Sequence, residues 1–287
     1  MKPLIIYHGG CPDGFCAAWV AYSALGGAEL LAANYGTEPP LEALVGDWRR
    51  VYILDFSYPL LEMERLANAA ASLVILDHHK TAQATLAALK IPRGHAVFDM
   101  ERSGAGIAWD YFHGSNLADF PISGGRPWLV RYVQDRDLWR WELEESKSVS
   151  AYVMAQPHTI EAWDVLAATP LEKVIEYGKA IRLHVEHYID LVVSNARIGQ
   201  LTYHLSVPWP CIVVNAPMPN ISDVLSRLLE QHLGVDLAVG WWARGDNKYQ
   251  YSLRSRPSLD CSEIAKSFGG GGHAQAAGFE SDRLVHT

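Results

Sequence analysis

Six residues whose side chains can bind metal ions or carry protons follow three apolar segments of the chain. They are His8, Asp13, Asp55, Asp77, His78 and His79. Carboxylate oxygens and imidazole nitrogens are common ligands of divalent metal ions. An isolated Asp-His-His triplet could equally be one hydrogen-bonded pair beside a surface histidine. Because residues of these types recur after three segments, we favour a divalent-metal site.

The three segments, 4–7, 51–54 and 73–76, have the composition of buried β-strands. Helical patterns are expected over 15–25, 60–71 and 81–89, and further strands over 28–35 and 96–98. This alternation predicts a parallel sheet with helices on both faces. The carboxyl ends of the strands would bring the six residues to one edge, where open α/β sheets bind ligands.

Two more acids, Asp135 and Asp137, flank Arg136 in a tryptophan-rich stretch with a helical apolar face. Acids beside an arginine commonly form surface ion pairs that contribute little. The apolar surroundings indicate that at least one of the two points inward. A buried acid needs a partner such as a metal ion or an arginine.

Candidate substrate-binding residues lie in two places. Ser103 precedes a helix expected over 105–112, where N-capping alone would explain it and contact with a substrate is the alternative. Near the end of the chain, four glycines lie between two stretches that we expect to be helical, and a histidine follows them. Glycine amides beside a histidine and an arginine form a phosphate receptor, which we favour over a flexible linker. The residues concerned are Gly270, Gly271, Gly272, His273 and Arg254.

The second half of the chain predicts a smaller unit. Residues 171–197 keep a helical period long enough to bridge two domains, and Gly199 ends it. We expect strands over 200–207, 211–215, 236–243 and 249–254 and a helix over 222–233. The predicted organisation is a catalytic α/β domain over 1–170, a connecting helix over 171–199, and a smaller α/β domain with a mixed sheet over 200–287.

Composition narrows the functional classes. The chain has 287 residues, of which 49% are hydrophobic, and a formal net charge of −8. Such a charge gives no field that would hold long duplex nucleic acid, so a nucleic-acid substrate would be short. The four cysteines form neither a zinc spacing nor a disulfide framework, and the first apolar run is too short to span a membrane. We expect a soluble, cytoplasmic monomer or homodimer.

With both ends of the chain interpreted, the sequence resembles the DHH phosphoesterase superfamily, in the branch with a DHH-associated C-terminal domain. The resemblance rests on His8 and Asp13, Asp55, the triplet Asp77 to His79, Asp135 and the segment Gly269 to His273. These elements occur in the family's order over nearly the whole chain. The resemblance implies an N-terminal α/β domain with two metal ions, usually manganese, and a C-terminal domain that closes over a phosphorylated substrate.

The resemblance also implies roles for single residues. Asp55 would bridge the metals, His8 and Asp13 would hold one ion, and His78 and Asp135 the other. His79 and His273 would face the phosphate, and Asp77 would orient the neighbouring histidines. The expected catalytic residues are therefore Asp55, Asp77 and His79.

One departure from the family affects the metal site. The first motif normally carries two aspartates separated by one residue, but only Asp13 is present here. Either Phe15 or Cys11 occupies the place of the missing acid, and the sequence leaves the register open. One metal would lose an oxygen ligand and bind weakly, and a Cys11 thiolate would favour a softer ion than Mg²⁺.

The predicted reaction is metal-dependent hydrolysis of a phosphoester or phosphoanhydride. Two divalent ions, Mn²⁺ or alternatively Mg²⁺ or another transition metal, would generate the nucleophile and neutralise the developing charge. We favour phosphodiester cleavage of short oligonucleotides or small nucleotides. The alternatives are hydrolysis of polyphosphate or pyrophosphate, and a nucleotide-binding regulator that has lost turnover.

Overall fold

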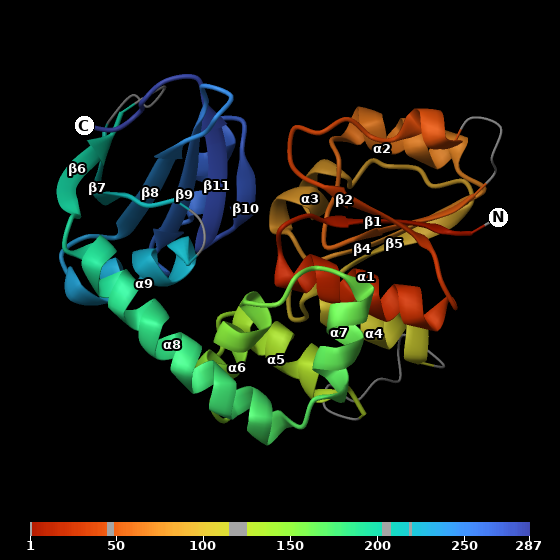
Figure 1. Cartoon of the computed structure of the whole chain (residues 1–287). Helices are drawn as coiled ribbons and strands as arrows, with labels where there is room; N and C mark the ends of the chain where they lie inside the picture. The colour runs from red at the N-terminus through yellow and green to blue at the C-terminus, as the bar shows by residue number, and fades with distance from the viewer. Residues whose placement is uncertain (1, 45–48, 115–124, 203–207, 218–219) are drawn as a thin grey trace. The chain divides into compact units, whose positions relative to one another are not determined.

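A computed structural model describes residues 2–44, 49–114, 125–202, 208–217 and 220–287. The chain divides into two compact units, Met1–Arg182 and Leu183–Thr287. We call them the N-terminal unit and the C-terminal unit. Figure 1 follows the chain through both, from red to blue.

The N-terminal unit contains a five-stranded parallel sheet with the strand order β2-β1-β3-β4-β5. Its strands are β1 (Leu4–His8), β2 (Glu29–Ala33), β3 (Arg50–Leu54), β4 (Ser72–Asp77) and β5 (Gly94–Phe98). The three central strands, β1, β3 and β4, are nearly continuous apolar runs because both of their faces are buried. The predicted parallel α/β fold is confirmed.

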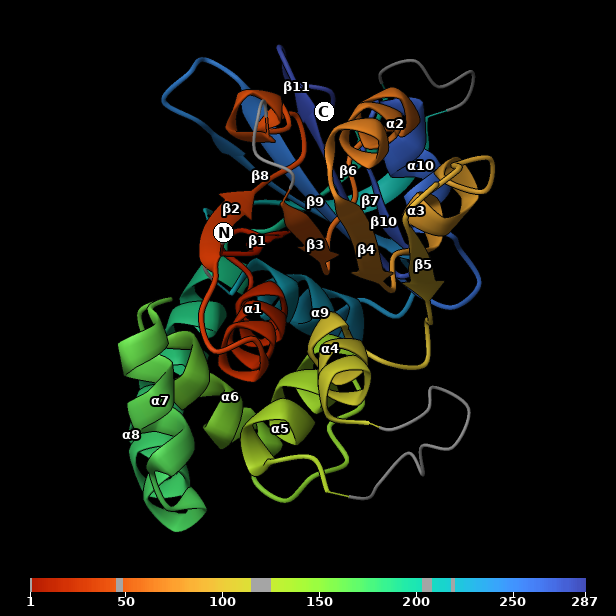
Figure 2. The same ribbon diagram turned by 90° about the vertical axis from the view of Figure 1, so that its right-hand side faces the viewer.

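Helices cover both faces of this sheet. They are α1 (Pro12–Ala24), α2 (Leu60–Ala69), α3 (Lys80–Thr85), α4 (Gly104–His113), α5 (Trp128–Asp137), α6 (Ser146–Met154) and α7 (Ile160–Ala168). Figure 2 shows α2 on one face of the sheet and α1 and α4 on the other. Successive side chains of β1 point to opposite faces of the sheet and pack in both cores. Ile5 and Tyr7 pack under α1, whereas Leu4 and Ile6 pack under α2. The strand ends between these layers are therefore held rigidly.

The boundaries of some elements differ from the sequence-based ones. Helix α3 ends at Thr85 rather than near residue 89, and α6 and α7 were not expected. The long helix is present as α8 (Leu171–Val193), and the division between the two units falls inside it. Among the residues described, no helix combines the length and the apolar character needed to cross a membrane.

The C-terminal unit contains a six-stranded mixed sheet with the order β10-β11-β9-β8-β7-β6. Its strands are β6 (Arg197–Leu201), β7 (Trp209–Asn215), β8 (Leu237–Ala243), β9 (Tyr249–Ser255), β10 (Gly271–His273) and β11 (Ala276–Ser281). Helix α9 (Ile221–Gln231) connects β7 to the parallel strand β8, and α10 (Cys261–Ser267) follows β9. The other neighbours pair antiparallel, which confirms the predicted mixed sheet.

One expectation for this unit is wrong, and another falls partly outside the described residues. The residues after the four glycines form the hairpin β10–β11 rather than a helix, because β11 pairs with β9 along six positions. Tertiary strand pairing here overrides a helical pattern. The predicted strand over 200–207 begins earlier, at Arg197, and its residues 203–207 lie outside those described.

Candidate metal centre

Asp55 occupies the centre of a polar cluster at the carboxyl edge of the N-terminal sheet. It follows the last residue of β3 with a left-handed backbone, φ 55°, and its N–H donates to the carbonyl of Leu76. Aspartate tolerates this conformation better than most residues. Gly104 at the start of α4 packs against it, and a Cβ there would lie only 2.5 Å from the Cβ of Asp55. The close packing fixes the carboxylate at the strand end.

Three histidines approach the two oxygens of Asp55. Nε2 of His78 lies 3.0 Å from Oδ1, and Nδ1 of His79 lies 3.9 Å from the same oxygen. Nδ1 of His8 lies 3.4 Å from Oδ2. Oδ1 of Asp55 thus faces two histidines and Oδ2 faces the third.

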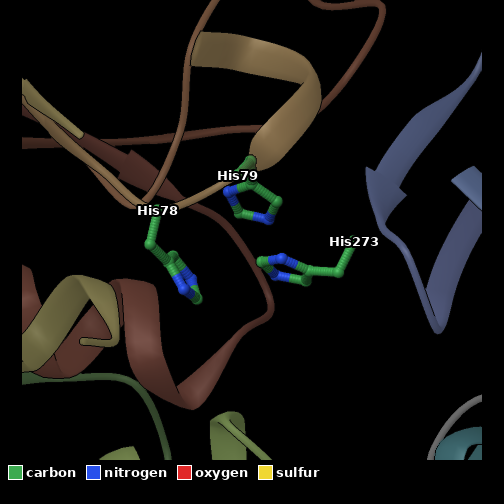
Figure 3. Close-up of side chains that lie close together, drawn as sticks. All are labelled: His78, His79 and His273. Carbon is green, nitrogen blue, oxygen red and sulfur yellow. The ribbon is translucent and has the colours of Figure 1, made fainter. Parts of the chain in front are cut away.

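The side chain of Asp77 orients the two histidines that follow it. Its Oδ1 accepts hydrogen bonds from the backbone N–H groups of His78 and His79, and lies 2.7 Å from Nδ1 of His79. Its Oδ2 accepts from the hydroxyl of Ser57. Figure 3 shows the rings of His78 and His79 projecting from the segment between β4 and α3. With both oxygens engaged and the side chain fully buried, Asp77 supports its neighbours rather than facing a ligand.

Within the N-terminal unit, two groups of three side chains could each hold a metal ion. One group is His8, Asp55 and His79, and the other is Asp13, His78 and Asp137; the ligand atoms of each lie within 4.8 Å of one another. Asp55 and His78 touch across the two groups. The arrangement matches a pair of adjacent divalent-ion sites.

Two buried carboxylate oxygens in these groups have no hydrogen-bond donor among the described residues, which shows whether the groups suit a metal ion. Oδ1 of Asp13 accepts a hydrogen bond from the N–H of Ala105, but its Oδ2 accepts none within the described parts of the chain, and neither does Oδ2 of Asp137. Buried acceptors without donors are costly unless a cation engages them. Hard oxygen atoms combined with imidazole suit Mn²⁺, and the residue set therefore fits a divalent ion.

The buried carboxylates of the cluster lie close together, so a nearby positive charge would stabilise their ionised forms. Burial and the charges of Asp137 and Asp55 raise the pKa of Asp13 well above its usual value. Burial would lower the pKa of His78, but the neighbouring carboxylates of Asp137 and Asp55 raise it to about 10. Burial opposes the ionisation of Asp55, yet the hydrogen bonds of His78 and His8 hold its pKa below the usual value. A protonated histidine or a bound cation can supply the charge that these acids require.

The expectation that Asp135 joins this cluster is corrected by the geometry. Asp135 accepts hydrogen bonds from the N–H groups of Glu142 and Leu143 and from the hydroxyl of Ser146. Its side chain therefore fixes the loop after α5. Asp137 instead lies beside the metal-binding groups, with its Oδ2 3.5 Å from Nε2 of His78. Both acids point away from solvent, but Asp137 and not the expected Asp135 faces the metal-binding groups.

The two candidate positions for the missing aspartate differ in their surroundings. Phe15 is buried in the core, stacked on His158 and edge-on to Trp163 and Tyr7. Cys11 is the residue before α1. Burial, followed by the charges of Asp55, Asp137 and Asp13, raises the pKa of its thiol. Cys11, not Phe15, thus occupies the side of the chain that faces the acids.

Ser103 is enclosed rather than presented to a substrate. It is fully buried, and its hydroxyl caps α4 by accepting from the N–H of Gly106. The capping explanation therefore accounts for it. Together with Gly104 and Ala105, it brings the start of α4 against Asp13, a support that the sequence gave no means of recognising.

The phosphate-receptor candidates lie in the C-terminal unit. Arg254 is on β9 and donates to the hydroxyl of Ser222, and His273 ends β10. Gly270 and Gly272 are required by the hairpin, because a Cβ at either would collide with backbone of β11. Packing accounts for these two glycines, and the role of the segment in binding phosphate stays a prediction.

A search of protein-family models matches residues 211–284 to the DHHA1 domain. This match covers most of β7 and all of β8 to β11. The C-terminal unit therefore contains a DHHA1 domain. In the other unit, Asp77 ends β4, and His78 and His79 follow it. The N-terminal unit contributes buried His and Asp groups able to hold metal ions.

Three proteins are similar to this chain along nearly its whole length. It is 30% identical to "Uncharacterized protein R106" of Acanthamoeba polyphaga mimivirus over 96% of its own length, and spans 66% of that relative. The DHH domain of a "Member of s1p family of ribosomal proteins" shares its fold with a TM-score of 0.58 and 13% identity, over 96% of this chain and 82% of that one. Exonuclease RecJ bound to manganese gives a TM-score of 0.49 and 14% identity, over 97% and 85% of the two chains. At 13% identity, the first of these two structures indicates the fold alone.

Proposed function

We propose that this protein is a member of the DHH superfamily and a metal-dependent phosphodiesterase that hydrolyses short oligonucleotides or small nucleotides, within a reducing, cytoplasmic setting. The observation that carries the proposal is the pair of three-residue groups joined at Asp55 and His78. The DHHA1 match supports the reaction class, and the net charge of −8 supports a short substrate. The four free cysteines suit a reducing compartment.

In this proposal, His8, Asp55 and His79 hold one divalent ion, Asp13, His78 and Asp137 hold the second, and Asp55 contributes to both. Such ions supply charge stabilisation to the phosphoryl oxygens and lower the pKa of a nucleophilic water. The role of Asp137 replaces the one first expected of Asp135. The surrounding residues keep this set in place before substrate arrives, which lowers the cost of reaching the transition state.

Other residues are proposed to orient the metal-binding side chains or to bind the substrate. Oδ1 of Asp77 lies 2.7 Å from Nδ1 of His79 and holds the orientation of that ring, and we assign the other ring nitrogen to the ion. The N–H of Ala105 fixes one oxygen of Asp13 and leaves the other for the metal. In the C-terminal unit, Gly270, Gly271, Gly272, His273 and Arg254 are proposed to bind the phosphorylated substrate.

A substrate screen of the full chain tests the proposal. The purified protein with Mn²⁺ is incubated with short RNA and DNA oligomers, cyclic dinucleotides, adenosine 3′,5′-bisphosphate and polyphosphate. We expect hydrolysis of the oligomers or small nucleotides that is lost on chelation and in the Asp55→Asn variant. Cleavage of polyphosphate alone would identify a phosphoanhydride hydrolase. Nucleotide binding without turnover would identify a regulator in which Cys11 occupies the position of the missing aspartate.

A further inference from the structure

Tyr35 presents an exposed aromatic ring beside the candidate metal centre. Among the Phe, Tyr and Trp side chains described in the N-terminal unit, only Tyr35 and Tyr177 are largely exposed, at 53% and 48%. Tyr177 lies on α8 against Tyr152 of α6. Tyr35 instead lies next to two of the histidines proposed to bind metal and phosphate. An exposed tyrosine at this place has no role in the core.

The ring of Tyr35 is supported from within the site. Its centroid lies 5.7 Å from the ring of His8 and 6.4 Å from that of His79, both edge-on, and 5.4 Å from the ring of Phe56. Phe56 is fully buried. The tyrosine thus rests on a fixed aromatic base and borders the group formed by His8, Asp55 and His79.

The backbone also holds this ring in position. Tyr35 is the second residue of a tight turn closed by a hydrogen bond from the N–H of Thr37 to the carbonyl of Asn34. The hydroxyl of Thr37 donates to the same carbonyl. Gly36 has φ +85°, as the third position of a type II turn requires. A side chain fixed by its backbone loses little conformational freedom on binding a ligand.

We propose that Tyr35 is a stacking platform for a nucleobase of the substrate, an inference that rests on the proposed phosphodiesterase function. A substrate whose phosphate lies at His8, Asp55 and His79 carries its base one sugar away, where the exposed ring of Tyr35 is available. Every base has a π-face, so stacking recognises nucleotides without selecting a sequence. Tyr35 therefore separates nucleotide substrates from polyphosphate, which has no base.

Calorimetry with two ligands that differ only in the base tests this role. The full chain is titrated, in the presence of Mn²⁺, with adenosine 5′-monophosphate and with methyl ribofuranoside 5-phosphate. We expect Tyr35→Ala to weaken binding of the nucleotide by roughly 5- to 150-fold, the range measured for loss of base stacking. Binding of the riboside phosphate should not change. Tyr35→Phe should keep the nucleotide affinity, and Tyr177→Ala should leave both affinities unaltered.

Each contrary result has a distinct meaning. Unchanged nucleotide affinity in Tyr35→Ala, or an equal loss for both ligands, would overturn the stacking role while leaving the phosphodiesterase proposal intact. The same holds if the wild-type chain hydrolyses nucleotides but binds both ligands equally. A wild-type chain that binds neither ligand and cleaves no phosphodiester would overturn both proposals. Urea unfolding of Tyr35→Ala verifies that the variant is folded, and Tyr35→Leu separates loss of aromaticity from loss of bulk.

Discussion

Oδ1 of Asp55 lies 3.0 Å from Nε2 of His78, and this contact joins the two groups of metal-binding side chains. The two residues follow neighbouring strands, β3 and β4, which pair in parallel register. Parallel pairing places the carboxyl ends of both strands at one edge, so two residues 23 positions apart meet. The contact makes Asp55 the residue through which both metal positions would be coupled.

Replacement of Asp55 is expected to remove metal binding while sparing the fold. Asp55→Asn keeps a residue type that tolerates the left-handed backbone but removes the charge. Manganese affinity should fall by more than the roughly 10- to 100-fold that loss of an outer partner costs. Calorimetry with Mn²⁺ measures this, and circular dichroism checks the fold. Near-native affinity in Asp55→Asn would remove this residue from the metal site.

The two acids of α5 should differ in what they affect. Asp137→Asn should weaken manganese binding with little change in stability, because its Oδ2 accepts no hydrogen bond from the described residues. Asp135→Ala should lower the free energy of unfolding by about 2–4 kcal/mol, because Glu142, Leu143 and Ser146 lose their acceptor. Urea unfolding and Mn²⁺ calorimetry on both variants make the comparison. The opposite pattern would return the ligand role to Asp135.

The missing aspartate can be restored at only one of two positions. Cys11→Asp should strengthen manganese binding by about tenfold or more, because it adds a hard oxygen ligand beside the other acids. Phe15→Asp should destabilise the fold by about 4 kcal/mol or more, because it buries an unpaired charge between His158 and Trp163. Stepwise Mn²⁺ titrations, with thermal unfolding in parallel, distinguish the two. Tighter binding in a folded Phe15→Asp variant would reverse the register.

A buried ion pair that braces α4 should matter for stability. Arg126 forms two hydrogen bonds with the carboxylate of Asp110 and a third, 3.2 Å long, with Oε1 of Gln134. Both ions are almost fully buried, but Asp110 also pairs with Arg102, so Arg126→Ala should cost about 3 kcal/mol of unfolding free energy, the low end for breaking a buried pair. Arg227, which pairs with Glu186 and Asp190 at the surface, is the control, and Arg227→Ala should cost at most about 1 kcal/mol. Equal costs in urea unfolding would show that the Asp110 pair contributes no more than a surface contact.

Sequence patterns were sufficient for the fold and for the edge at which the site lies. Apolar runs ending at His8, Asp55 and Asp77 have the composition of strands buried on both faces, and the helices between them leave parallel pairing as the solution. Parallel strands necessarily align their carboxyl ends. The convergence of these side chains therefore follows from local composition together with the order of elements.

Only the tertiary structure decided which side chain of a local pair faces the cluster. Asp135 and Asp137 are two residues apart on α5, and two residues of a helix differ in direction by about 200°. Which of them faces the cluster depends on the face that packs against α4 and α1, and both faces carry apolar residues. The same reasoning separates Cys11, ahead of α1, from Phe15 on the buried face of that helix. Periodicity identifies a helix, but its rotation about its own axis is set by contacts with residues distant in the sequence.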